Sequence, residues 1–195
     1  MRSACLALSA ILLGGLCAPA LAAESAAPYV VLSGRDSAVE KPECLRIRTA
    51  DEWAAVWKRH APTGHPPAVG PNVDFERCMV IAVFLGATVN TYGIRVVETV
   101  ERDVKRTTKV VGPANIELFE KTEEGKGELA IGLDRLSYQS TGGGDAATPY
   151  AFLILPRTDK AVVLRFDTRD LRQRSDNVAP IWKQRHRFPA VKPGK

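Results

Sequence analysis

The sequence contains few of the residues that most often carry catalysis or bind metal ions. It has three histidines and four cysteines in 195 residues, and its composition is otherwise ordinary, with 45% hydrophobic and 25% charged residues. Such a composition excludes a disordered chain, a collagen-like repeat and a small disulfide-rich scaffold. No internal repeat with a period of about 20 to 50 residues occurs. The length predicts a single domain.

The motifs of common enzymes are also missing. No serine lies in Gly-x-Ser-x-Gly or Ser-x-x-Lys, and the glycine run at 142–144 lacks the lysine and hydroxyl residue of a phosphate-binding loop. His60 and His65 are separated by Pro62, which ends a helix, so they do not share a helical face as a zinc-binding pair would. We therefore predict no enzymatic activity, no metal and no cofactor. The alternative is a small hydrolase that uses His60 or His65 with Asp74.

The N-terminus (residues 1–23) has the pattern of a secretory signal peptide. Arg2 is followed by an apolar stretch at 4–16 and by the small-residue run 20–23. We expect cleavage near the end of that run. An uncleaved anchor is the alternative, because the uncharged stretch approaches the about 20 residues that span a bilayer. The mature chain is predicted to be periplasmic or secreted, without a stable membrane span.

Signal cleavage leaves two cysteines, Cys44 and Cys78, in a compartment that favours disulfides. We therefore predict one disulfide between them. Closing this loop would stabilise the fold by about 3 to 4 kcal/mol in the chain-entropy treatment. Two separate buried thiols are the alternative.

One amphipathic helix is predicted in the first half of the mature chain. Thr49 and Glu52 form a capping box, so a helix should begin there, and Pro62 should end it. Trp53 and Trp57 lie on its apolar stripe, and we expect both to be core anchors.

Strands are predicted to outnumber helices. The apolar, β-branched run 78–85 is typical of a strand buried on both faces, and we expect it to form an antiparallel hairpin with 93–101. Further strands are expected at 44–48, 107–111, 128–133, 150–155 and 161–166. The predicted fold class is α+β, a mainly antiparallel β-sheet with one principal helix packed on it. The domain should occupy 44–168, after a lead-in segment at 24–43 with at most one short strand.

These segments, taken in order, resemble the PrcB C-terminal-like family, whose founding member is a component of a protease complex. The resemblance rests on Glu52-Trp53, Asp74-Phe75, an apolar strand ending at Gly86, Tyr92-Gly93 and Pro149-Tyr150. It covers most of the mature chain. It implies a small exported α+β domain that accompanies or stabilises other envelope proteins, in the founding case a protease complex. Phe75, Gly86, Pro149 and Tyr150 would be framework positions, and the resemblance supplies no catalytic residue.

The C-terminal segment 169–195 is basic and carries two aromatic residues. Its candidate contacts for an anionic polymer or an acidic partner are Arg172, Arg174, Trp182, Lys183, Arg185 and Arg187. Nucleic acid is not expected as the target of an exported protein. The alternative is a partly disordered tail whose charges are solvated or paired with the acidic segment 117–128.

The sequence therefore predicts a non-catalytic accessory domain that binds or stabilises a partner protein in the bacterial envelope. Such a domain should expose an apolar or charged patch. The alternatives are a binder of anionic envelope polymers, with salt-dependent binding through the tail, and the small hydrolase. A hydrolase should instead gather a histidine, Asp74 and a nucleophile in one pocket.

Overall fold

The computed structural model describes residues 30–61, 69–111, 117–171 and 178–192; for 103–111 and 117–126 it describes the backbone only. The predicted signal peptide, His65, Arg172 and Arg174 lie outside these residues. None of the helices in the described ranges is both long enough and apolar enough to cross a membrane.

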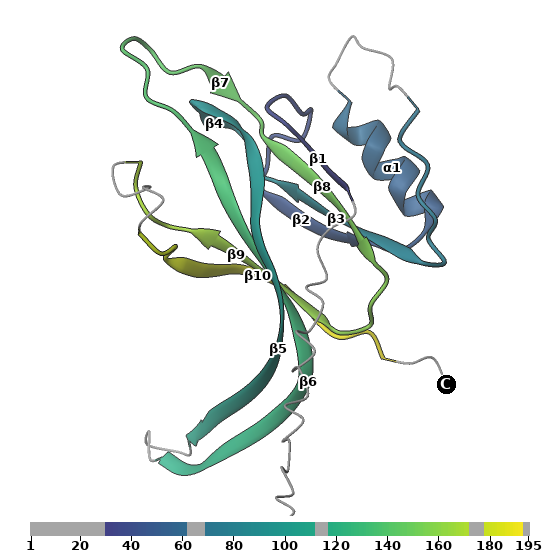
Figure 1. The fold of residues 1–195 in the computed structure, drawn as a ribbon, viewed down its shortest axis with the longest axis vertical. Helices are drawn as coiled ribbons and strands as arrows, with labels where there is room; N and C mark the ends of the chain where they lie inside the picture. Colours follow the sequence, from purple (N-terminus) through teal and green to yellow (C-terminus); the bar gives the residue numbers. More distant parts are fainter. Residues whose placement is uncertain (1–29, 62–68, 112–116, 172–177, 193–195) are drawn as a thin grey trace, which may run out of the picture.

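Across the described residues the fold consists of two four-stranded sheets, one two-stranded sheet and one helix (Figure 1). The first sheet is antiparallel throughout, with the order β1-β8-β3-β2. Its strands are β1 (Val30–Gly34), β2 (Glu43–Ile47), β3 (Cys78–Phe84) and β8 (Tyr150–Pro156). The helix α1 (Ala50–His60) lies against this sheet. The predicted α+β class, mainly antiparallel with one principal helix, is confirmed.

The second sheet has the order β10-β9-β6-β5. Its strands are β5 (Thr91–Val111), β6 (Glu117–Ser137), β9 (Ala161–Asp167) and β10 (Trp182–Phe188). β6 and β9 are parallel and the other pairs antiparallel. A short ribbon of β4 (Thr88–Val89) and β7 (Ala146–Ala147) lies apart from both sheets.

The alternating side chains of β3 fill two different cores. Met79, Ile81 and Val83 pack between the two sheets, whereas Val80 and Phe84 pack toward α1. All five are at most 1% exposed. This confirms the strand buried on both faces that the uninterrupted apolar run predicted, since neither face of such a strand can be polar.

The helix begins and ends close to the predicted positions. Thr49 and Glu52 form the capping box, with the Thr49 hydroxyl accepting from the Glu52 N–H at 3.2 Å. Trp53 is buried, and Trp57 is half-buried beside it with ring centroids 5.1 Å apart. Both rings contact Phe152 of β8, so the two tryptophans anchor the helix to the first sheet as predicted.

The predicted hairpin between 78–85 and 93–101 is wrong. β3 pairs with β2 and β8, and β5 pairs with β6. The chain leaves the first sheet after β3 and begins the second with β5, so strands that are neighbours in sequence lie in different layers. The composition of 124–127 indicates a turn before the strand expected at 128–133, and this prediction is also wrong, because β6 runs through the segment.

Both ends of the domain extend further than predicted. The segment 24–43 contains β1, which pairs with β8, and Val39, which is 8% exposed in the helix-side core. At the other end β10 pairs with β9, and Phe188 belongs to the core between the sheets. The domain limits of 44 and 168 are therefore too narrow, and the expected disordered tail is wrong for 182–188.

The predicted disulfide is not formed, and Cys44 and Cys78 are both free thiols. Cys44 lies opposite Val83, five positions along β3 from Cys78, which is about 16 Å at the usual rise of a strand. A disulfide needs Cα atoms within about 7 Å. The thiols also face different cores, with Cys44 between the sheets and Cys78 on the helix side.

Candidate functional site

The second sheet extends into a two-stranded arm, here residues 103–111 of β5 and 117–126 of β6. β9 pairs with β6 only at Glu128–Leu133, so beyond that point the described strands give β6 no partner except β5. Figure 1 shows this ribbon projecting away from both sheets. β5 is in addition an edge strand of the sheet over its whole length.

The register of the arm places opposite charges across from each other. Lys105 is paired with Glu124, Arg106 with Glu123 and Lys109 with Glu120. Opposite charges at facing positions favour an antiparallel pair. The β5 side of the arm is thus mainly basic and the β6 side mainly acidic. Two copies of the arm that met edge to edge along the same strand would bring like charges together, which disfavours self-pairing.

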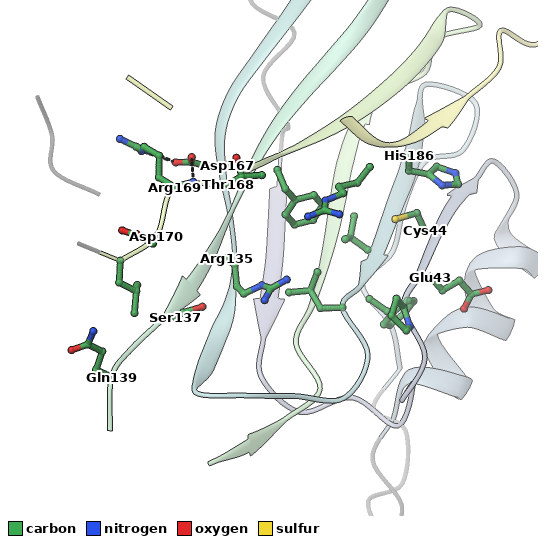
Figure 2. Close-up of a pocket in the computed structure, with 17 residues that line it drawn as sticks. Glu43, Cys44, Arg135, Ser137, Gln139, Asp167, Thr168, Arg169, Asp170 and His186 are labelled. Carbon is green, nitrogen blue, oxygen red and sulfur yellow. Dashed lines mark hydrogen bonds and ion pairs between the residues drawn. The ribbon is translucent and has the colours of Figure 1, made fainter. Parts of the chain in front are cut away.

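A cleft of about 900 Å³ opens between the two sheets at the end away from the arm (Figure 2). We call it the inter-sheet cleft. Its apolar lining is Pro42, Cys44, Val83, Phe84, Leu85, Phe166 and Leu171. Its polar lining is Glu43, Arg135, Ser137, Gln139, Asp167, Thr168, Arg169, Asp170, Arg185 and His186. The volume falls within the range of about 300 to 1,000 Å³ that is usual for small-ligand sites.

One wall of the cleft is fixed by a buried ion pair. Asp167 is bound to Arg169 at 2.6 Å and also accepts the Ile181 N–H at 3.2 Å. Burial alone would raise the pKa of the Asp167 carboxyl, but the hydrogen bonds from Arg169 and Ile181 outweigh it, so this pKa is lowered. The carboxylate therefore stays ionised and ties the end of β9 to the residues before β10.

The remaining cations of the cleft come from β6 and β10. Arg135 follows the buried part of β6, and Arg185 is an exposed residue of β10. Figure 2 shows Arg135 pointing into the cleft and Glu43 pointing away from it. Glu43 is bound outside the cleft to Arg59 of α1, at 2.6 Å.

Cys44 is the thiol of the cleft, and it is not an activated nucleophile. Burial, and the nearby charge of Glu43, raise the pKa of this thiol to about 11. A catalytic cysteine needs the opposite shift, because the thiolate is the reactive form. The structure therefore favours an inert thiol here, in agreement with the alternative of two separate thiols, although both are half-buried and not fully buried.

His60 lies in a buried contact with Ser37. Its Nδ1 is 3.0 Å from the Ser37 hydroxyl, and both residues are 7% exposed. The imidazole is packed against Tyr150 and Phe152, with ring centroids 4.0 and 5.1 Å away. Neither residue lines the inter-sheet cleft. A serine and a histidine at this distance resemble a nucleophile and its base, but substrate cannot reach them.

Asp74 does not join His60 in a pocket. Its carboxylate accepts the N–H of Glu76 at 3.0 Å and its carbonyl that of Cys78 at 2.7 Å, so it shapes the turn before β3. No group of three or more metal-binding side chains occurs in the described ranges. His60 and Asp74 therefore each make structural contacts of their own and neither lines the inter-sheet cleft, while His65 lies outside the described residues.

The His60 contact predicts a pH-dependent stability. Burial lowers the pKa of His60 from 6.5. The imidazole of His60 is therefore protonated at a lower pH in the folded chain than in the unfolded chain. The stabilisation from neutral His60 should be complete above pH 6.5 and be lost as the pH falls toward the lower folded-state pKa. Urea unfolding of wild type and His60→Gln, compared at about pH 7.5 and about pH 5, should show a smaller acid loss in the variant. An equal loss in both would assign the effect to another group.

The predicted framework residues sit where the first sheet meets its loops. Phe75 and Tyr150 pack against the helix-side core. The Pro149 carbonyl accepts the Leu85 N–H at 2.9 Å, and Gly86 has a φ of 73°. Gly86, Pro149 and Tyr150 lie where the end of β3 meets the start of β8, whereas Phe75 lies just before β3.

Among the described candidate contacts of the C-terminal segment, Trp182 and Arg187 are half-buried in contacts within the domain. Trp182 packs over Gly132, where an added Cβ would lie 2.6 Å from the ring, and the Arg165 guanidinium lies 5.4 Å from its centroid. Arg187 is bound to Glu128. Of the described candidates only Lys183 and Arg185 are exposed. A polymer-binding tail therefore has fewer accessible cations than its sequence indicates.

Sequence reasoning missed both the arm and the cleft. The cleft gathers residues from β2, β3, β6, β9 and β10, none of which lies in a recognisable local motif. Comparison of the chain with protein-family models, with curated proteins and with solved structures finds no match. The resemblance to the PrcB C-terminal-like family stays a prediction from the sequence.

Proposed function

We propose that this chain is an exported, non-catalytic accessory domain that binds a partner protein in the bacterial envelope through its arm. A protease complex is the partner class that the family resemblance implies. The observation that carries the proposal is the length of β5 and β6, which continue well past β9 with no further strand beside them among the described residues.

An arm of this kind is poorly stabilised by its own contacts. A two-stranded ribbon is at best marginally stable in water, and a third strand or a packed face is needed for independent stability. A strand of a partner protein that pairs with the open edge of β5 would be this third strand. Such pairing is the β-augmentation mode of recognition. The lysines and arginines of β5 favour an acidic strand, because opposite charges stabilise facing positions.

The other features support binding rather than catalysis. The buried Ser37–His60 contact has no access to substrate, and the raised pKa of Cys44 opposes nucleophilic attack. Export is supported by the signal-like N-terminus of the sequence.

The proposal is tested by shortening the arm. In this variant residues 103–126 are replaced by a tight turn that joins Arg102 to Gly127, and tagged mature protein is used to recover partners from the periplasmic fraction. We expect wild type to recover one protein in a fixed ratio at both low and high salt, and the shortened variant to recover none. A thermal melting curve of each protein shows whether the two sheets and the helix remain folded.

A second variant serves as the matched control. Lys183→Gln with Arg185→Gln removes the exposed cations of β10 and leaves the arm unchanged. This variant should recover the same partner as wild type. Recovery that depends on Lys183 and Arg185, is released by salt and survives shortening of the arm would contradict the proposal and favour polymer binding.

A further inference from the structure

The walls of the inter-sheet cleft are fixed by contacts between the two sheets. On one side of the fold the Ser33 hydroxyl of β1 accepts the Ile94 N–H of β5 at 2.9 Å. On the other side the Arg46 guanidinium of β2 donates at 3.2 Å to the carbonyl of Pro189, just after β10. Two residues before Arg46, Cys44 already lines the cleft. Because the sheets are tied at these two places, the cleft is preformed, and a ligand does not have to open it.

One wall of the cleft is apolar and partly exposed. Cys44, Val83, Leu85 and Phe166 line it, and all four belong to or pack against the core between the sheets. Leu85 and Cys44 are only half-buried. A molecule with an apolar part would cover this margin of the core and remove apolar surface from water.

The carboxylates and guanidiniums of the lining are equal in number. There are three of each, Glu43, Asp167, Asp170, Arg135, Arg169 and Arg185. Asp167 and Arg169 form the ion pair described above, and Glu43 is bound to Arg59. A charged head group in the cleft would meet as many like charges as opposite ones and would lose hydration on entering. The lining therefore favours an uncharged ligand.

Uncharged polar side chains belong to the same lining. Ser137 and Gln139 contribute a hydroxyl and an amide (Figure 2). Either group can donate a hydrogen bond to a hydroxyl or accept one from it. An uncharged polar head group therefore finds hydrogen-bond partners in the cleft.

We propose that the inter-sheet cleft binds a small uncharged amphiphile, with its alkyl part against Leu85 and Phe166 and its polar head group toward Ser137 and Gln139. This site is separate from the arm and does not depend on the proposed partner protein. It predicts that the protein carries or senses such a ligand in addition to its protein contact.

The head group is tested by calorimetric titration of the full mature chain with three amphiphiles of equal length, each kept below its solubility or micelle limit. 1-Decanol should bind severalfold more tightly than either decanoate or decyltrimethylammonium. 1-Octanol should bind about tenfold more weakly than 1-decanol, since each buried methylene contributes about 0.8 kcal/mol. No binding of 1-decanol, or equal or tighter binding of either charged amphiphile, would overturn the proposal.

The place of binding is tested by amide NMR spectra of labelled protein with and without 1-decanol. The signals of Leu85 and Phe166 should shift. Those of Ile47 and Val56 should not, because both line a separate cleft of about 400 Å³ between β2 and α1. Shifts confined to Ile47 and Val56 would place the ligand in that other cleft and contradict the proposal.

Two leucine variants form a matched pair for the same titration. Leu85 and Leu45 are both half-buried, but Leu85 lines the inter-sheet cleft, whereas Leu45 packs against the helix-side core. Leu85→Ala should weaken 1-decanol binding severalfold, and Leu45→Ala should leave it unchanged. A melting curve of each variant sets a temperature at which both are folded. Equal effects of the two substitutions would argue against this site.

The arm-shortened variant separates this inference from the proposed function. It should still bind 1-decanol with the affinity of wild type, even where it recovers no partner. Loss of binding with an intact melting curve would show that the cleft is not an independent site and would refute the inference.

Discussion

Replacing Phe152 by alanine should lower the free energy of unfolding by about 3 to 5 kcal/mol, as expected for removing a buried phenylalanine from a core. Phe152 is 0% exposed. Its ring centroid lies 5.0 Å from that of Trp53 in a T-shaped contact and 5.7 Å from that of Phe84. The helix, β3 and β8 therefore all meet on this one side chain, and a cavity there weakens all three contacts.

The measurement is urea unfolding followed by tryptophan fluorescence, with Phe152→Leu and Val31→Ala as comparisons. The leucine variant keeps most of the apolar volume and should lose less stability. Val31 is 40% exposed on an edge strand, so its truncation should have little effect. A loss below about 1 kcal/mol in Phe152→Ala would mean that α1 does not pack on β8 as described.

Replacing Gly86 by alanine should cost about 2 kcal/mol or more, for two additive reasons. The residue has a φ of 73°, a region that disfavours any side chain with a Cβ. An added Cβ would also lie 2.7 Å from the Glu40 carbonyl oxygen, which already accepts the Ala87 N–H at 2.8 Å. Backbone atoms cannot move aside as a flexible side chain can, so the turn after β3 must distort.

Gly142→Ala is the matched control for Gly86→Ala. An added Cβ at Gly142 meets nothing within 4 Å. This variant should be neutral or slightly stabilised, because alanine restricts the unfolded chain. Equal stability of the two variants in thermal unfolding would contradict the strained backbone at Gly86.

The elements that the sequence predicted well are those specified by local physical rules. The capping box of Thr49 and Glu52 fixes the start of α1, because the two side chains satisfy backbone donors of the first turn. The apolar run of β3 is short for a helix and rich in β-branched residues, which favoured a strand buried on both faces. In both cases the signal lies within about ten residues of the element it describes.

The pairing of strands was not predictable in this way. β10 has the sequence Trp-Lys-Gln-Arg-His-Arg-Phe, which resembles a solvated basic tail because its central residues face water. Its pairing with β9 and the contact of Phe188 with the core between the sheets show that it is a strand. The disulfide was wrong for a related reason, because cysteine spacing carries no information about which face of a strand each thiol occupies.

The cleft and the arm escaped prediction for different reasons. The cleft residues are distant in sequence and converge only because β2, β6 and β10 bring them to the same side of the fold. The arm was divided in the sequence interpretation into shorter strands and a turn, since Glu124 to Gly127 has the composition of a turn. β5 and β6 pair on both sides of this segment, with a register shift between Arg102 and Val104, and this pairing overrides the local preference.

The position of β8 in the middle of the first sheet determines when this chain can fold. β8 lies between β1 and β3, although β1 begins at residue 30 and β8 at residue 150. Until β8 has been synthesised, β1 has no neighbour in its sheet and the apolar edge of β3 is open to other chains. A chain cut before Tyr150 should therefore aggregate rather than form a half-domain. Folding has to wait for the last quarter of the sequence, which would suit the proposed export of the chain.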